Sequence, residues 1–322
     1  MTASTATSPS SSSPIQPSAE QIDRKGLFLG LACYMLWGVF PIYFKSVGHV
    51  DSLQILLNRV VWSLVFIAIM VTVTRRWYAV LPALRNRRVL GLYTLAALVL
   101  AVNWYIYIWA VTHDHILEGS LGYFINPLVS VLFGVLVFRE RMRPGQIGAV
   151  LVAAAGVAYL TWSYGHLPWI ALTLALTFGF YGVLKKRAPL PADAGMAIET
   201  GVLFLPSLLG LIVFAWLGTG QLFQGDAATS GLLMLAGPIT AIPLILFAGA
   251  AQRLPLYMVG MLQYLAPTLQ MLVGVLIYNE PFPPYKLVGF AIIWLALLIY
   301  TVEGFVASRR LAGQPAPLSE PA

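Results

Sequence analysis

Charged side chains inside long apolar stretches are the residues of this sequence that could do chemistry, because an ion removed from water needs a partner or a function. Arg59, preceded by Asn58, lies well inside one such stretch. We expect its guanidinium group to pair with Glu118, at the start of another apolar stretch, or with the carboxylate of a bound solute. The alternative is that this long side chain extends to a polar surface.

Glu199 and Lys45 also lie within apolar stretches. Glu199 is a candidate proton carrier, because a carboxylate in a low-dielectric environment takes up a proton readily. Pairing of Glu199 with Lys185 or Lys186 is an equally good interpretation. We expect Lys45 to reach the outer surface, with a role in gating as the alternative. Lys45, Glu118 and Glu199 therefore form the candidate set for coupling or gating.

Aromatic and amide side chains accompany these charges. Asn103 and Tyr107 are one helical turn apart, and Trp104 lies beside Asn103. Rings combined with one amide suit a flat, partly apolar ligand better than a bare ion. We therefore expect all three residues to line a binding cavity, with packing in an apolar core as the alternative.

Two prolines lie near the midpoints of matching apolar stretches, Pro127 within 117–140 and Pro267 within 257–280. Proline lacks an N–H, so we expect each one to break its helix and to leave the carbonyl of Tyr123 or Gln263 without a donor. Discontinuous helices at corresponding places in two halves indicate the binding site of a transporter. The alternative is that the prolines only bend the helices for packing. The nearby polar residues of the predicted site are Asn126, Ser130 and Gln270.

Residues for enzymatic or metal chemistry are missing from the apolar stretches. All aspartates and all four histidines fall in predicted loops or tails, and Cys33 is the only cysteine. The sequence His113-Asp114-His115 offers no firm third ligand for a metal. Glu140 and Glu280 end equivalent helices and are interpreted as anchors of the following loops. We therefore expect no enzyme activity, no cofactor and no metal site.

The elements that must position these side chains are transmembrane helices. The 322 residues are 59% hydrophobic and only 10% charged, whereas soluble domains carry about 25% charged residues. Ten apolar runs, each near the ~20 residues that span the hydrocarbon region of a bilayer, follow one another. They predict an all-α polytopic membrane protein with ten helices at about 26–46, 53–72, 89–111, 117–138, 145–162, 167–184, 196–217, 231–251, 257–279 and 286–305.

The basic residues alternate between the two sides that ten helices define. Sixteen of the 19 lysines and arginines fall on the side of both termini, and Lys286 alone falls in a loop on the other side. Since cytoplasmic loops are rich in Lys and Arg, both termini are predicted to be cytoplasmic in the inner cell membrane. The dispersed charge argues against a nucleic-acid partner.

The chain divides into two units of five helices. The predicted organisation is a disordered cytoplasmic tail at 1–24, a first repeat at 25–162, a second repeat at 163–306 and a cytoplasmic tail at 307–322. Because five is odd, the second unit enters the membrane inverted relative to the first, as in alternating-access carriers.

Several motifs resemble one family of transporters. NWYIYIWAV at 103–111, LEGSLGYFINPL at 117–128, LWGVFPIYFK at 36–45 and LLNRVVWS at 56–63 are similar to the RarD subfamily of EamA transporters, in the drug/metabolite transporter superfamily. The resemblance implies ten helices, two EamA-type repeats and export of small metabolites or drugs, with chloramphenicol among the associated compounds. The second copy departs from the first in detail, since Asn126 corresponds to Ala266.

These features together predict a secondary transporter that exports chloramphenicol-like or amino-acid-like solutes by alternating access, with proton coupling. Its predicted partners are a small-molecule substrate, the lipid bilayer and protons. Small residues such as Gly145 and Gly289 favour close helix packing, either within one chain or in a homodimer. A channel or membrane receptor is the first alternative function, and an intramembrane enzyme is the second.

Overall fold

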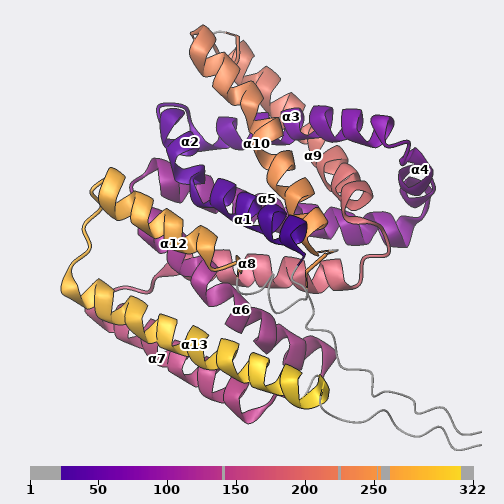
Figure 1. Cartoon of the computed structure of the whole chain (residues 1–322). Coiled ribbons are helices and arrows are strands. Elements are labelled where there is room, and N and C mark those ends of the chain that lie inside the picture. Colours follow the sequence, from indigo (N-terminus) through magenta and orange to yellow (C-terminus); the bar gives the residue numbers. More distant parts are fainter. Residues whose placement is uncertain (1–22, 140–141, 224–225, 252, 255–261, 313–322) are drawn as a thin grey trace, which may run out of the picture.

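A computed structural model describes residues 23–139, 142–223, 226–251, 253–254 and 262–312 of the chain (Figure 1). Within these residues all regular structure is helical, and no strand is present. The helices are α1 (Arg24–Gly38), α2 (Phe40–Ser46), α3 (Ser52–Val73), α4 (Trp77–Arg85), α5 (Arg87–Thr112), α6 (Ile116–Phe138), α7 (Pro144–Tyr164), α8 (Trp169–Lys186), α9 (Ala192–Trp216), α10 (Ala227–Ala251), α12 (Leu265–Leu272), the π-helical η1 (Val273–Ile277) and α13 (Pro284–Ala312).

The prediction of an all-α protein with helices that could cross a membrane is confirmed for the described residues. Eight helical segments in the described ranges are long and apolar enough to cross a bilayer, counting α1 and α2 as one segment. The 18-residue α8 falls outside that group, and α12 with η1 forms a shorter apolar helix over Leu265–Ile277. The first part of the predicted ninth helix lies outside the described residues.

Local sequence signals explain where several helices begin. Asp51 precedes α3, and its carboxylate accepts hydrogen bonds from the backbone N–H groups of Leu53 and Gln54. Asn86 caps α5 in the same manner, and α7 begins at Pro144. Such residues satisfy or replace backbone donors that have no partner inside the helix.

The first apolar stretch is interrupted, which the sequence analysis did not predict. α1 ends at Gly38 and α2 begins at Phe40, with Val39 between them at φ −93° and ψ 4°. Pro41 has no N–H for the carbonyl of Trp37, four residues earlier, so the helix cannot continue with its full set of hydrogen bonds. Gln270 of α12 supplies a donor instead, with its Nε2 3.0 Å from the Trp37 oxygen.

The two predicted breaks differ from each other. α6 continues as a helix through Pro127, so the helix is not broken there, and a kink at Pro127 stays a prediction. Membrane helices commonly tolerate an internal proline in this way. Beside Pro267 the chain is interrupted, because Gln263 and Tyr264 form a turn before α12.

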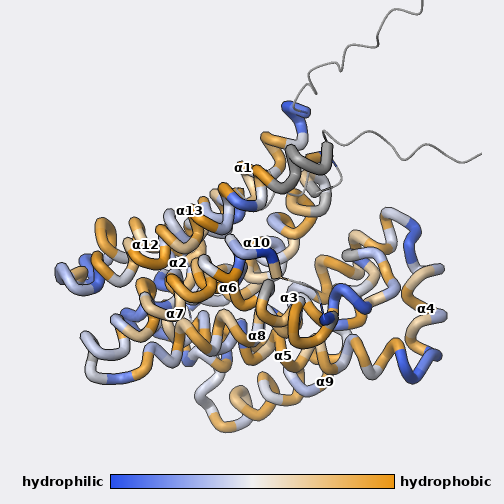
Figure 2. Tube along the Cα trace, turned by 90° about the horizontal axis from the view of Figure 1, so that it is seen from below, coloured by the Kyte–Doolittle hydropathy of each residue, from blue (hydrophilic) through white to orange (hydrophobic). Residues whose placement is uncertain are grey.

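A short helix, α4, lies where the sequence analysis placed a basic loop. Val80 and Ala83 are buried on one side of α4, while Tyr78 and Leu81 are exposed on the other. Figure 1 shows α4 running across the end of the bundle, where α3 ends and α5 begins. Hydrophilic residues stand at both ends of this short helix in Figure 2.

The helices pack in pairs that repeat between the two halves. α6 packs against α8 as α1 packs against α12, α5 against α8 as α1 against α10, and α5 against α9 as α3 against α10. α7 and α13 lie side by side at one edge of the bundle (Figure 1). A Cβ atom at Gly289 would lie only 2.2 Å from the Leu160 side chain, so this glycine permits the close approach of α13 to α7 within the chain.

Candidate functional site

Arg59 of α3 lies in the core of the helix bundle, with only 6% of its surface exposed. Its Nε donates a hydrogen bond to Thr240 Oγ1 of α10 at 2.9 Å. Its guanidinium carbon lies 4.2 Å from the centre of the Trp104 ring. The side chain therefore points into the protein and not toward a polar surface.

No carboxylate pairs with Arg59 among the residues that the structure describes. The expected pair with Glu118 is wrong in this conformation, because Glu118 lies in the first turn of α6, where its Oε1 is 3.6 Å from His115 Nδ1. A buried cation without a counter-ion is costly. Arg59 thus presents an unneutralised positive charge to the interior.

Aromatic rings surround this charge. Besides Trp104, the Phe44 ring centre is 5.7 Å from the Arg59 guanidinium. Phe44 packs edge-on against Tyr107 at 5.9 Å, and Tyr107 packs against Tyr123 at 5.5 Å. Ring faces carry partial negative charge, so they stabilise a cation more weakly than a carboxylate would. The predicted residues Arg59, Trp104, Tyr107 and Tyr123 are thereby brought together.

Three of the buried polar atoms that have no hydrogen-bond partner in the described part of the chain belong to helices that form this cluster, α3, α5 and α6. They are Asn58 Oδ1, Tyr107 Oη and Asn126 Oδ1. Asn58 precedes Arg59 on α3, and Tyr107 interacts electrostatically with Arg59. Buried polar groups are nearly always paired, so unpaired ones call for an unseen water, ion or ligand. Arg59, Tyr107 and the amide oxygens offer both donors and acceptors to such a ligand.

Asn103 of α5 contacts two other helices, α8 and α6. Its Nδ2 donates to the Leu174 carbonyl at 3.0 Å and to Thr177 Oγ1 at 2.9 Å, both on α8. Its Oδ1 accepts a long hydrogen bond from Tyr123 Oη at 3.4 Å. Asn103 therefore orients Tyr123 beside the cluster, and its amide donor is used within the protein.

The second-half residues lie at the helix breaks. Gln270 is buried and uses its Nε2 on Trp37, which leaves its Oε1 without a partner in the described residues. Gln263 is half-buried in the turn before α12, and Pro267 is buried in α12. Ser130 of α6 is exposed, whereas Asn126, one helical turn earlier, is buried.

The outer end, defined here as the end with the α5–α6 turn and the start of α13, is held by charged groups. Lys45 of α2 forms an ion pair with Asp114, and its Nζ lies 5.5 Å from the Tyr278 ring centre. Glu280 accepts hydrogen bonds from the backbone N–H groups of Ile116 and Leu117 at 2.6 and 2.9 Å. A carboxylate there complements the positive end of the α6 dipole. Glu280 thus joins the second half to the first helix turn of α6.

Glu199 of α9 is buried in an ion pair. Its Oε1 lies 2.9 Å from Lys185 Nζ, and its Oε2 accepts from Tyr181 Oη at 3.1 Å. The same lysine lies 5.1 Å from the Tyr93 ring centre. The pairing interpretation of Glu199 therefore describes this conformation, and a proton reaching Glu199 would weaken its contact with Lys185.

The sequence did not indicate that Thr240 and Phe44 contact Arg59, or that Glu280 contacts the start of α6. Glu280 had one usable signal, since an ionisable residue next to an apolar stretch must find a partner. Thr240 and Phe44 carry no such signal. In the described ranges no group of three His, Cys, Asp or Glu side chains could hold a metal ion. The Arg59 cluster offers a positive charge, aromatic faces and a few polar atoms, which is the chemistry of a site for a small organic solute.

One family model, several relatives and solved structures match this chain. The model of the EamA-like transporter family matches residues 24–162 and again residues 168–302. A solved structure described as "Crystal structure of protein" superposes with a TM-score of 0.54 at 20% identity, over 86% of this chain and 97% of that one. That likeness concerns the fold alone.

Relatives match nearly the whole chain. The "Uncharacterized transporter YojE" of Bacillus subtilis is 44% identical over 285 residues, covering 86% of this chain and 94% of the relative. "Protein RarD" of Streptomyces exfoliatus is 43% identical, covering 94% and 98%. The "Chloramphenicol-sensitive protein RarD" of Pseudomonas aeruginosa is 35% identical, covering 91% and 98%.

Proposed function

This chain belongs to the EamA-like transporter family, and from that premise we propose that it exports small organic solutes across the inner cell membrane by alternating access. The observation that carries the proposal is the buried Arg59, whose charge has no carboxylate partner among the described residues. A resident positive charge without a counter-ion suits a solute that brings an anionic or strongly electronegative group.

The proposed architecture is ten transmembrane helices in two inverted repeats. α8 and the α12–η1 segment join the eight longer spans as helices that cross with help from protein neighbours. The repeated packing pairs support a pseudo-two-fold relation between halves, because three helix pairs between the first unit and the second recur with the two units exchanged. The two matches of the family model, to 24–162 and 168–302, support the same division. With five helices in each unit, both termini lie on the basic, cytoplasmic side.

The proposed solute lies between α2, α3, α5, α6, α10 and α12. Arg59 donates to an oxygen of the solute while Trp104 and Tyr107 contact its flat part. Tyr123 is held in place by Asn103, and Asn126 and Gln270 offer free amide oxygens. Chloramphenicol-like and amino-acid-like compounds both combine electronegative groups with a small apolar body.

In this conformation we propose that the outer end is closed. The Lys45–Asp114 pair joins α2 to the α5–α6 turn within the first half, and Glu280 joins the second half to the start of α6. Opening toward the outside requires both contacts to separate. Lys45 and Glu118 then act as gating residues, since both lie within this end of the bundle.

Proton coupling is proposed to act through Glu199. Protonation would remove its negative charge from Lys185 and Tyr181 and so change how α9 is held against α8. The proton gradient can drive export if protonation of Glu199 favours either the inward-open or the outward-open state.

The test uses purified protein in proteoliposomes. Labelled chloramphenicol and labelled amino acids are measured for counterflow, in which an excess of unlabelled solute on one side drives accumulation of label on the other. A carrier accumulates label and saturates. A channel equilibrates label without accumulation, and a receptor binds it without flux, so either result would replace the proposal by one of the alternatives.

A further inference from the structure

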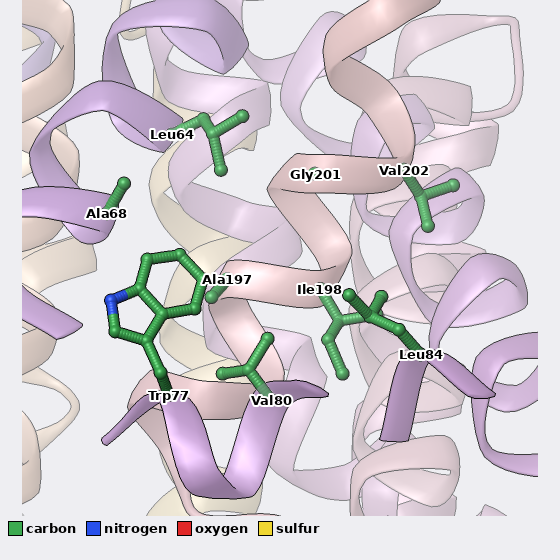
Figure 3. Close-up of a pocket in the computed structure, with 9 residues that line it drawn as sticks. All are labelled: Leu64, Ala68, Trp77, Val80, Leu84, Ala197, Ile198, Gly201 and Val202. Carbon is green, nitrogen blue, oxygen red and sulfur yellow. The ribbon is translucent and has the colours of Figure 1, made fainter. Parts of the chain in front are cut away.

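A second site lies away from the Arg59 cluster. A pocket of about 300 Å³ opens between α3, α4 and α9 (Figure 3). It is lined by Leu64 and Ala68 of α3, by Trp77, Val80 and Leu84 of α4, and by Gly201 of α9, among others. The volume is at the lower end of the range of about 300–1,000 Å³ for ligand pockets.

The lining of this pocket is apolar. Trp77 carries the only polar side-chain atom of the lining residues, and its Nε1 already donates to Thr72 Oγ1 at 2.9 Å. Glu199, although it lies between two lining residues on α9, directs its carboxylate to Lys185 and Tyr181. The pocket therefore offers nothing to a polar solute and suits a hydrocarbon chain.

Gly201 keeps the pocket open. Gly201 is an exposed residue of the lining, and a Cβ atom added there would meet no atom within 4 Å, so the structure leaves space for a larger side chain at this edge of the pocket. Glycine weakens a helix relative to other residues, and no contact at this position requires it. A larger side chain at position 201 is therefore expected to occupy part of the pocket.

The helix that covers the pocket has the character of an interfacial helix. Its outward side exposes 75% of Tyr78 and 55% of Leu81. Arg75 and Arg76 precede it, and Arg85, Arg87 and Arg88 end or follow it, all exposed. A short helix with an exposed apolar side and basic flanks lies at the boundary between head groups and acyl chains.

Most of this positive charge is unneutralised by the protein. Arg76 pairs with Asp193 at 2.8 Å, whereas the other four arginines form no ion pair in the ranges that the structure describes. Clusters of basic residues beside a transmembrane helix attract anionic lipid head groups. The arginines therefore provide charge complementarity to a phosphate at the mouth of an apolar pocket.

We propose that this pocket binds one acyl chain of an anionic phospholipid, with its head-group phosphate held by the arginines at the ends of α4. The lipid comes from the leaflet at the arginine-rich end of the bundle. Its chain fills the space beside Gly201 and packs against Trp77 and Leu84. The proposal requires only that the protein lies in a membrane, so it does not depend on which solute the transporter carries.

The test measures lipid retention by native mass spectrometry of the detergent-purified protein. Phosphatidylglycerol is compared with phosphatidylethanolamine of the same acyl chains. We expect one phosphatidylglycerol to be retained preferentially. Gly201→Leu fills the pocket and should abolish that preference, and it should fold because leucine favours helix more than glycine does. Gly231→Leu is the matched control, since a Cβ at Gly231 also meets nothing within 4 Å.

Two double variants test the contact between the arginines and the lipid head group. Arg75→Gln with Arg85→Gln should weaken phosphatidylglycerol binding by about 25-fold at low salt, at about 5-fold for each arginine removed. Arg24→Gln with Lys25→Gln removes the same charge from another exposed place and should have little effect. Equal retention of the two lipids, or retention unchanged by Gly201→Leu, would overturn the proposal.

Photo-crosslinking gives a result that does not depend on any variant. Phosphatidylglycerol with a diazirine in its acyl chain should label residues 64–84 and 197–202 of the unmodified protein. Labelling that spares both segments would refute the site.

Discussion

Replacement of Arg59 by methionine separates a role in binding from a role in folding. Methionine has a similar length but no charge. The change removes the hydrogen bond to Thr240 and the contact with the Trp104 ring. A hydrogen bond to a charged group contributes about 1.5–3 kcal/mol, and a desolvated cation–π contact about 2 kcal/mol.

The desolvation cost of the buried charge nearly cancels these two losses of stability. A buried cation without a counter-ion costs several kcal/mol of desolvation, and Arg59→Met removes that cost. The free energy of unfolding is therefore expected to change by less than about 2 kcal/mol, with either sign. Such near-balance is expected where a residue serves function more than stability.

Solute affinity should respond much more strongly. Loss of one charge-assisted hydrogen bond to the solute, at about 1.5–3 kcal/mol, corresponds to about a 10- to 150-fold weaker apparent affinity. Arg59→Lys keeps the charge but not the planar group that stacks on Trp104, so we expect it to recover only part of the affinity.

The assays are solute counterflow in proteoliposomes and thermal unfolding in detergent, on samples of equal purity. Arg24→Met is the control, because Arg24 is an exposed arginine at the start of α1. A large drop in unfolding temperature together with unchanged transport would refute the reasoning and assign Arg59 to stability alone.

Three further predictions concern the gate, the proton and the helix break. Glu280→Gln weakens the contact with the first backbone amides of α6, so outward-open states should gain population. The measurement is the labelling rate of a cysteine placed beneath the outer end in a cysteine-free background, which should rise. Unchanged labelling would argue against a gate. Glu199→Gln should abolish the pH dependence of export and leave Lys185 without its carboxylate, whereas a retained pH profile would remove Glu199 from proton coupling. Gln270→Leu leaves the Trp37 carbonyl without its side-chain donor. The free energy of unfolding, measured by thermal or denaturant unfolding, should fall by about 1–3 kcal/mol. An unchanged unfolding curve would mean that another donor replaces Gln270.

The outer contacts and the Arg59 cluster share one short helix, α2. Lys45 and Phe44 are neighbours on α2, yet one contacts Asp114 at the outer end and the other faces Arg59. Movement of the short α2 about the break at Val39 would therefore affect both places together. This arrangement offers a direct physical link between solute binding and opening of the outer end.

The sequence by itself determined the kind of molecule. Its apolar runs must be helical, because only internal hydrogen bonding satisfies a backbone in hydrocarbon, and each run that the structure describes is helical. It also indicated that Arg59, Trp104, Tyr107 and Tyr123 gather in one place, since polar and charged groups in such helices turn inward. The short α4 escaped detection because its nine residues are too few to span a bilayer and contain an internal proline, Pro82.

The tertiary structure alone decided which atoms pair. Arg59 contacts Thr240, 181 residues away, and not Glu118, and Glu280 reaches the start of α6 from the other half of the chain. It also decided that the helix continues through Pro127 but breaks near Pro41, where Gln270 supplies the missing donor. The physical reason is that periodicity and charge fix which face of a helix is buried, whereas hydrogen bonds have a range of about 3 Å and depend on how the helices are placed beside one another.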